Sequence, residues 1–242
     1  MRFRKRRLNP GICNYCHTEV ERSRMAKHLT SCSARRKVIQ QAEQKEAAPE
    51  RLYHLLVEDA WLPEFWLHLE MRGSSTLKEL DKYLRAIWLE CCNHLSDFHE
   101  VMHGKRVKKS LPIQEVFDET DELLHIYDYG TPSETLITVV AVREGKPTTP
   151  HPIALMARNC MPNTQCSRCG QPAKWWCSEC LAEVDAIVHL CDACREAHYR
   201  EHTEAIGDDD LSFEEYLEGI FPLVNSPRLG MCGYTGPAEP PY

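Results

Sequence analysis

Four pairs of potential metal ligands are crowded into residues 166–202, and no other feature constrains the fold of this chain as strongly. Eight cysteine and histidine ligands at this spacing are enough for two Zn²⁺ ions with four protein ligands each. So short a segment buries too little apolar surface to fold alone, so zinc binding is expected to drive its folding. The pairs are Cys166-x-x-Cys169, Cys177-x-x-Cys180, Cys191-x-x-Cys194 and His198-x-x-x-His202.

The spacing does not decide which pairs share an ion. In a sequential arrangement, the ligands from Cys166 to Cys180 hold one ion and those from Cys191 to His202 hold the other. The pattern also resembles the B-box class of zinc modules, and this resemblance implies an interleaved arrangement. One site is then formed by Cys166, Cys169, Cys191 and Cys194, and the other by Cys177, Cys180, His198 and His202. Because protein fills every ligand position in either arrangement, both sites are expected to be structural.

A second group of ligands lies near the other end of the chain. Cys13-x-x-Cys16 is followed by His28-x-x-x-Cys32, whose two ligands lie one turn apart on a helix and project from the same side. We predict a short hairpin followed by a helix, with Ser23 as its N-cap and with Met25 and Leu29 on its inner face. The pattern resembles the CCHC class of small ββα fingers. Together with the C-terminal module, this finger brings the expected content to three structural Zn²⁺ per chain.

The charge of the chain is unevenly distributed. Residues 1–50 contain 12 Lys/Arg against 5 Asp/Glu, although the whole chain has a net charge of −7. A basic finger favours contact with DNA or RNA phosphates, whereas the acidic C-terminal module favours a protein partner. A protein-interaction scaffold whose basic end binds acidic proteins is the alternative. The candidate phosphate-binding residues are Arg2, Arg4, Lys5, Arg6, Arg7, Arg22, Arg24, Lys27, Arg35, Arg36 and Lys37.

The thirteen cysteines favour metal binding over disulfides. Their number is odd, most lie in Cys-x-x-Cys pairs, and the N-terminus has no apolar core of a signal peptide. No apolar run is long enough to span a membrane. These observations predict a cytoplasmic protein with no membrane contact. Cys160 lies just outside the C-terminal pattern as a spare thiol.

Residues 51–158 predict a central mixed α/β domain, flanked by the two zinc modules, so that the chain as a whole belongs to the α+β class. Ser75 or Thr76 is expected to cap a helix that ends near Asn93. Strands are expected near 53–57, 65–71, 95–101, 123–127 and 136–142. The other predicted segments are the basic finger (1–34), a helical linker (35–50) that separates it from this domain, the C-terminal zinc module (160–204) with a small core of Trp175, Trp176 and Leu190, and an acidic helix with an extended tail (205–242).

The central segment also resembles a known family. The residues that carry the resemblance are Trp61-x-Pro63-Glu-Phe-Trp66, Leu77-x-x-Leu80-x-x-x-Leu84, His94-Leu95-x-x-Phe98 and Tyr127-Asp128-Tyr129-Gly130. In this order they resemble the pRiA4b-type plasmid family, whose small α+β domains are often passengers of mobile elements. The resemblance implies a fold, and no particular activity.

One motif suggests another class of protein. His99-Glu100-Val-Met-His103 fits the H-E-x-x-H signature of zinc hydrolases, in which one helical face supplies two ligands and a general base. Gly104 and a basic loop follow at once, where a hydrolase helix has to continue. We therefore expect these residues at a strand end, and we predict a non-enzymatic protein with no small-molecule substrate.

Overall fold

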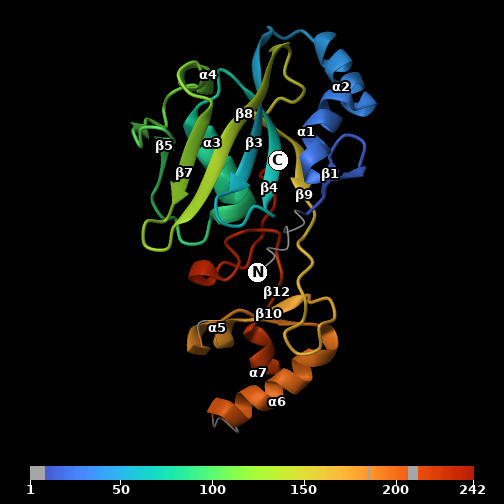
Figure 1. The fold of residues 1–242 in the computed structure, drawn as a ribbon, viewed down its shortest axis with the longest axis vertical. Helices are drawn as coiled ribbons and strands as arrows, with labels where there is room; N and C mark the ends of the chain where they lie inside the picture. The colour runs from blue at the N-terminus through green and yellow to red at the C-terminus, as the bar shows by residue number, and fades with distance from the viewer. Residues whose placement is uncertain (1–8, 185, 207–211) are drawn as a thin grey trace, which may run out of the picture.

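The apolar and alternating runs of the middle segment pair into one large antiparallel sheet. The computed structural model describes residues 9–184, 186–206 and 212–242, with side chains except those of 183, 184 and 202–206. The fold is α+β, as predicted, and the nine strands lie in the order β2-β1-β9-β4-β3-β8-β7-β5-β6 (Figure 1). Their bounds are β1 Gly11–Cys13, β2 Glu19–Val20, β3 Glu50–Asp59, β4 Trp66–Arg72, β5 Ser96–Glu100, β6 Arg106–Val107, β7 Glu122–Tyr127, β8 Ser133–Gly145 and β9 Ile153–Asn159.

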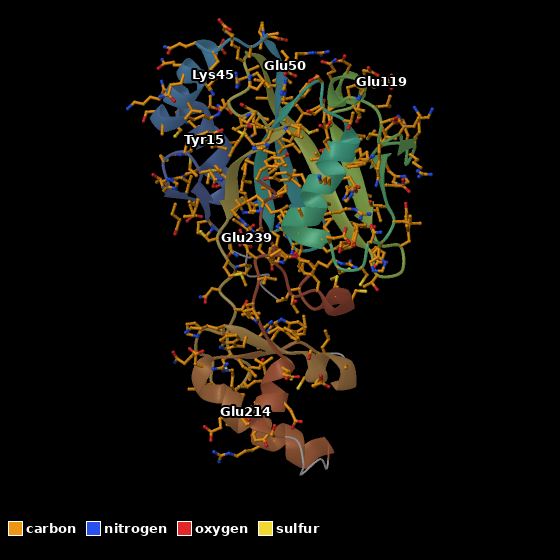
Figure 2. All side chains as sticks on the ribbon, turned by 180° about the vertical axis from the view of Figure 1, so that it is seen from behind. Tyr15, Lys45, Glu50, Glu119, Glu214 and Glu239 are labelled. Atoms are coloured by element: carbon orange, nitrogen blue, oxygen red, sulfur yellow. The ribbon has the colours of Figure 1, made fainter. Side chains whose placement is uncertain are left out.

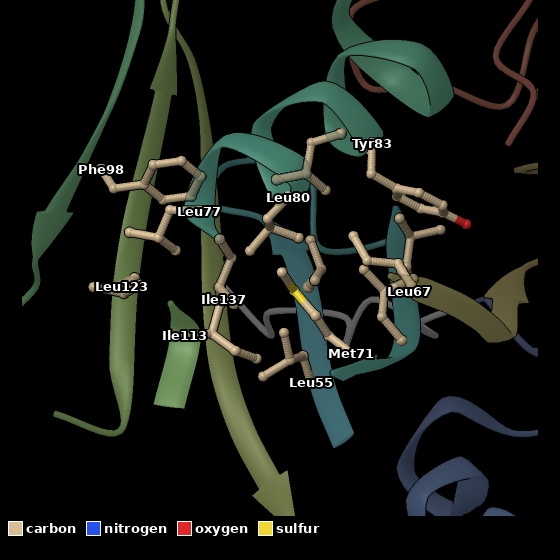
Figure 3. Packing of buried hydrophobic residues seen from close by; sticks show 14 of the residues in the cluster. Leu55, Leu67, Met71, Leu77, Leu80, Tyr83, Phe98, Ile113, Leu123 and Ile137 are labelled. Carbon is tan, nitrogen blue, oxygen red and sulfur yellow. The ribbon is translucent and has the colours of Figure 1, made fainter. Parts of the chain in front are cut away.

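One face of this sheet is covered by the predicted helix. Thr76 is its N-cap, and the side chain of Glu79 accepts a hydrogen bond from the Thr76 backbone N–H at 2.6 Å. The α-helix α3 (Leu77–Leu84) continues as a π-helical turn, η1 (Arg85–Leu89), and presents its apolar side to the sheet. Figure 3 shows Leu77 and Leu80 packed over Leu55, Met71 and Ile137. A short helix that the sequence did not predict, α4 (Ile113–Phe117), closes one end of this core.

Strand β4 is buried on both faces, because a second layer covers the side away from α3. Leu67, Leu69 and Met71 belong to the core under α3, whereas Trp66 packs with Met25 and Leu29 of the N-terminal finger. The polar residues His68 and Glu70 share the finger side of the strand. This second layer consists of α1 (Arg22–Ser31) and α2 (Ser33–Glu43).

The finger is continuous with the sheet. Strand β1 pairs with β9, with Gly11 opposite Asn159 and Cys13 opposite Ala157. The predicted linker helix forms as α2, but it packs against the sheet and does not hold the finger away from the domain. Helix α1 begins at Arg22, after Glu21, so Ser23 lies within its first turn and is not its N-cap.

The C-terminal module has its own small sheet, in the order β11-β10-β12. Strand β12 pairs with β10, and Tyr216 packs against Cys177 and Cys180, so the module continues to Pro222 and does not end at 204. Trp176 and Leu190 are buried in the module, and Trp175 is half-buried at its edge. The elements are β10 Trp175–Cys177, α5 Ser178–Val184, β11 Val188–Leu190, η2 Asp192–Cys194, α6 Arg195–Ile206, α7 Phe213–Glu218 and β12 Ile220–Pro222.

The last segment, residues 223–242, returns from the module to the body. Asn225 Nδ2 donates to the backbone oxygen of Asn159 at 2.9 Å, so the outgoing and returning chains lie side by side in a narrow neck (Figures 1 and 2). Beyond the neck, Arg228 is fully buried, and the turn η3 (Met231–Gly233) lies against the body. Across the described ranges, no helix is both long enough and apolar enough to cross a bilayer.

Candidate metal centres

The N-terminal group is assembled by β1, the turn after it and α1. The four ligands Cys13, Cys16, His28 and Cys32 have their donor atoms within 4.8 Å of one another. Cys16 Sγ lies 3.4 Å from His28 Nε2. His17 follows the second cysteine with a φ of 56°, a left-handed conformation that turns the chain back after the Cys-x-x-Cys pair. Cys13 and Cys32 are buried against the body, so this group lies at the junction between finger and sheet.

The first C-terminal group combines the first and third pairs, namely Cys166, Cys169, Cys191 and Cys194. Cys169 Sγ lies 3.6 Å from Cys191 Sγ. The backbone N–H of Ser167 donates to His189 O at 2.8 Å, which ties the first Cys-x-x-Cys turn to strand β11. Gly170 follows this turn with a φ of 72°, as His17 follows the turn in the finger.

The second C-terminal group contains Cys177 at the end of β10, Cys180 in α5 and His198 in α6. Cys180 Sγ lies 3.3 Å from His198 Nε2. His202 is one turn further along α6, but its side chain lies outside the described residues. The arrangement in the structure is thus the interleaved one of the two that the spacing left open.

The donor distances fit a tetrahedral zinc ion. Zn–S bonds of about 2.3 Å and Zn–N bonds of about 2.0–2.1 Å place ligand atoms ~3.8 Å apart for two sulfurs and ~3.6 Å apart for sulfur and nitrogen. The sulfur–sulfur distance of 3.6 Å and the sulfur–nitrogen distances of 3.3 and 3.4 Å are close to these values. A disulfide bond is about 2.05 Å long, so the same sulfurs are not bonded to each other. The clusters are therefore compatible with zinc binding.

The thiols within each cluster differ in acidity. The Thr18 hydroxyl lowers the pKa of Cys16 to about 6, and burial raises the pKa of Cys13 to about 11. Burial opposes ionisation of Cys166, but backbone N–H groups of Arg168 and Cys169 outweigh it and lower its pKa to about 6. Hydrogen bonds with Cys169 and Cys191 raise the pKa of Cys194 to about 12. Neighbouring thiolates thus oppose each other's ionisation, a cost that a bound divalent cation removes.

The basic residues of the finger fall into two sets. Arg22 pairs with Glu58, and Arg35 pairs with Glu70 at 3.0 Å, so both face the body. Arg24, Lys27, Arg36 and Lys37 are exposed on α1 and α2, and no carboxylate in the described ranges pairs with them. Arg2, Arg4, Lys5, Arg6 and Arg7 lie outside the described residues.

The H-E-x-x-H residues do not share a helix. His99 and Glu100 end strand β5, and His103 lies in the turn that follows. His99 Nδ1 lies 3.2 Å from the backbone oxygen of Gly104. Two helical ligands with a general base between them are therefore not formed by this motif. His54 and His68, on strands as expected, contact each other between sheet and finger.

The structure also brings together four residues that the sequence analysis did not select. Cys91, Cys92 and His94 follow η1, and Cys232 comes from the last segment. The local Cys-Cys-x-His sequence is the only signal of this cluster, because its fourth member is 138 residues beyond His94.

Comparisons with known proteins do not identify the chain. No protein-family model matches it, and no curated protein matches it. Among solved structures, it is similar to a protein of unknown function from Methanosarcina mazei Go1, with 18% identity and a TM-score of 0.40. The match covers 70% of this chain and 89% of that one.

Proposed function

We propose that this is a non-enzymatic zinc protein of the cytoplasm, which binds DNA or RNA through the exposed face of its finger and a protein partner through its C-terminal module. Full sets of four protein ligands support structural metal sites, because they leave no position for a reacting water, and His202 would complete the set of Cys177, Cys180 and His198. Membership of the pRiA4b-type family, and with it an origin as a mobile-element passenger, stays a prediction from sequence.

One observation carries the nucleic-acid half of the proposal: the separation of the basic residues of the finger into paired and unpaired sets. Arg22 and Arg35 form ion pairs with carboxylates of the sheet, and the side chains of both are less than half exposed. Arg24 and Lys27 on α1, and Arg36 and Lys37 on α2, are exposed instead, with Arg36 Nη2 donating to the backbone oxygen of Ser31. Because both helices pack against the sheet, these four cations are held on a rigid surface, which supports contact with phosphates.

The expected binding mode is contact with the phosphate backbone. Three thiolates and one Zn²⁺ add a charge of only −1, so the finger keeps its positive charge when the metal is bound. Cations that replace counterions on a nucleic acid give an affinity that falls steeply with salt. A single finger covers only about 3 base pairs, so little sequence preference is expected.

A charge-reversal variant tests this proposal. Fluorescence anisotropy with a DNA duplex and a single-stranded RNA across roughly 50–200 mM salt should show an affinity that falls with salt. Reversal to Glu at Arg24, Lys27, Arg36 and Lys37 should abolish binding. The matched control reverses four exposed lysines on α3, in the β5–β6 loop and just after β6: Lys78, Lys82, Lys105 and Lys108. Equal loss in both variants, or no binding by the natural chain, would refute the nucleic-acid half and favour the scaffold alternative.

Deletion of the finger is not a suitable test. Strand β1 pairs with β9, and Trp66 of the body packs against Met25 and Leu29 of α1. Removing residues 1–37 would therefore expose the sheet edge and part of the core, and any loss of binding would be ambiguous. Charge reversal at exposed positions leaves these contacts in place.

Three cations of the C-terminal module pair with carboxylates among the residues that the structure describes. Arg168 pairs with Glu201, Lys174 pairs with Asp192 at 2.5 Å, and Arg200 pairs with Glu196 at 2.6 Å. Such a surface of alternating charges is suited to a protein partner. We expect reversal of Arg200 to Glu to leave nucleic-acid affinity unchanged. A loss as large as that of the finger variant would show that the module, too, contacts the phosphates.

A further inference from the structure

A cluster outside the predicted sites joins the last segment of the chain to the body. Cys91, Cys92 and His94 lie in the turn that follows η1, and Cys232 lies in η3. Cys92 Sγ is 3.7 Å from Cys232 Sγ, and His94 Nε2 is 3.4 Å from the same sulfur. All four donor atoms lie within 4.8 Å of one another. We propose that these residues form a fourth metal site, which holds Zn²⁺ and fastens the C-terminal segment to the central domain.

The donor distances in this cluster fit a shared metal ion. A tetrahedral zinc ion separates two sulfur ligands by ~3.8 Å and sulfur from nitrogen by ~3.6 Å. The distances of 3.7 and 3.4 Å are close to both values. They also match the distances in the three predicted sites, although the ligands here are contributed by segments far apart in the chain.

The histidine is held in the orientation that a ligand needs. His94 Nδ1 lies 3.5 Å from Asp128 Oδ1, an arrangement that favours a proton on Nδ1, while Nε2 faces the sulfur of Cys232. Asp128 is itself fixed by Arg228, whose Nη2 donates to Asp128 Oδ2 at 2.6 Å. A carboxylate that orients a metal-binding histidine is a recurrent feature of zinc sites.

Arg228 also links the histidine side of the cluster to the cysteine side. Its guanidinium is fully buried and donates from Nη2 to Cys91 Sγ at 3.4 Å. Three thiolates, one neutral histidine and one Zn²⁺ carry a net charge of −1, and Asp128 brings this to −2, of which the buried cation of Arg228 offsets one. A buried guanidinium needs such anionic partners, and Asp128 together with a Cys91 thiolate supplies them.

The backbone around the cluster resembles that of the predicted sites. Asn93 follows Cys92 with a φ of 57°, just as His17 and Gly170 follow their Cys-x-x-Cys turns. Cys232 and Asp128 also have positive φ values, of 51° and 64°. Residues other than glycine rarely adopt this conformation, and they do so where the surrounding structure requires it. Three such residues meet at this one place, where they orient the ligands Cys92, His94 and Cys232.

The site has a mechanical consequence for the module. The chain leaves the body at Asn159 and returns along Asn225, and the neck between them is held by hydrogen bonds. A metal bound at Cys232 fastens the returning segment beyond Ser226, whose hydroxyl donates to Trp88 O at 2.6 Å. The C-terminal module is then held at both of its ends.

Native mass spectrometry of the full-length protein, purified under reducing conditions, tests the proposal. We expect four zinc ions in the natural chain and three in each of Cys232→Ser and Cys92→Ser, both of which alter exposed positions. Cys160→Ser is the control, because this thiol lies outside all four clusters, and it should keep four ions.

Three outcomes would overturn the proposal. They are three ions or fewer in the natural chain, an unchanged ion count in both variants, and a loss of more than one ion in both variants. The last result would mean that another metal site needs these cysteines in order to fold. Thiol labelling of the same sample gives an independent readout. If a metal is bound, Cys92 and Cys232 should both react with the thiol label once a chelator has removed the metal. A disulfide between them would keep both unreactive until reduction, and this result would also refute the site.

Discussion

Both ends of this chain carry groups of cysteine and histidine ligands, but the finger is part of the large sheet and the C-terminal module is not. The N-terminal finger contributes strand β1 to the large sheet, and its group of ligands lies against the buried residues Trp66 and Met156. The C-terminal module has its own three-stranded sheet and meets the body through the neck and through the last segment, whose Gly230 lies beside Leu181 of α5 and Ile187 (Figures 1 and 2). The finger therefore shares the core of the domain, whereas the module has only its metal clusters and a small core.

This difference assigns different roles to the metals. In the module, two ions would hold together elements too short to bury a core of their own. In the finger, one ion would shape a surface that the sheet already anchors. The two regions also differ in what lies beneath them: the buried polar residues His54, His68 and Glu70 and the half-buried Arg35 lie between the finger helices and the sheet, beside the apolar contact of Trp66 with α1.

The largest expected effect is the loss of the module when a metal ligand is removed. Cys177→Ser should abolish the protection of α5 and α6 in hydrogen exchange, since a structural zinc is worth roughly 10–16 kcal/mol. Strands β3, β4 and β8 should keep their protection. The exchange of Cys160→Ser should match that of the natural chain. Loss of protection in β3 and β4 as well would show that the two regions fold as one unit.

The polar layer under the finger should respond strongly to removal of its central carboxylate. Glu70 is buried and pairs with Arg35 of α2 at 3.0 Å and with Arg143 of β8 at 2.8 Å. Glu70→Ala leaves both guanidinium groups without their shared partner, at a cost of about 3–5 kcal/mol. Urea unfolding followed by circular dichroism measures the change.

The matched control for Glu70 is an exposed ion pair. Asp118 accepts hydrogen bonds from Arg51 at the surface, at 2.6 and 3.2 Å. Asp118→Ala should leave the free energy of unfolding nearly unchanged, because an exposed ion pair contributes little to stability. Equal costs for the two variants would mean that the layer beneath the finger contributes no more than a surface pair does.

The same layer predicts a pH dependence of the stability. Burial lowers the pKa of His54 to about 4 and that of His68 to about 3, and their ring nitrogens lie 2.8 Å apart. In the unfolded chain both titrate near pH 6.5, so below that pH the unfolded state binds more protons than the folded state. This contribution to the free energy of unfolding is fully present above about pH 6.5. It decreases as the pH is lowered, by about 2–4 kcal/mol at pH 5.

Acid also releases zinc, so this effect has to be read as a difference between variants. His54→Gln with His68→Gln removes both titrating groups, and the free energy of unfolding of this variant should fall less between pH 7 and pH 5. His103→Gln, in an exposed turn, should behave like the natural chain. Parallel pH profiles for all three proteins would contradict the assignment.

The smallest effect concerns the close approach of the finger to the sheet. A Cβ atom on Gly11 would lie 2.2 Å from the ring of Trp66 and 2.4 Å from the backbone oxygen of Arg158. Gly11→Ala should therefore displace β1 from β9 at a cost of about 1–3 kcal/mol. Hydrogen exchange should detect faster exchange in β1 and α1 and no change in β10. An effect on the module would indicate coupling through the neck.

The sequence predicted what depends on local patterns. Cys-x-x-Cys spacing selected the three ligand groups, and alternation or helical spacing located β4 and β7 close to their observed bounds, the middle of β3 and the start of α3. The helix ends at Leu84, with η1 reaching Leu89, and does not continue to Asn93. Pairings between distant segments left no local signal. Nothing near Gly11 indicates that it lies opposite Asn159, and nothing near Cys232 indicates that it meets Cys92. Burial of Arg228 was equally hidden, because its partner Asp128 belongs to another segment.

The central claim is that the cysteine and histidine clusters of this chain hold zinc, and the metal content of the intact protein tests it most directly. Inductively coupled plasma analysis with native mass spectrometry of the reduced, full-length chain should find zinc alone, in four ions, three of them in the finger and the C-terminal module. A chain that carries no stoichiometric metal, and whose mass shows cysteines paired in disulfides, would contradict the account.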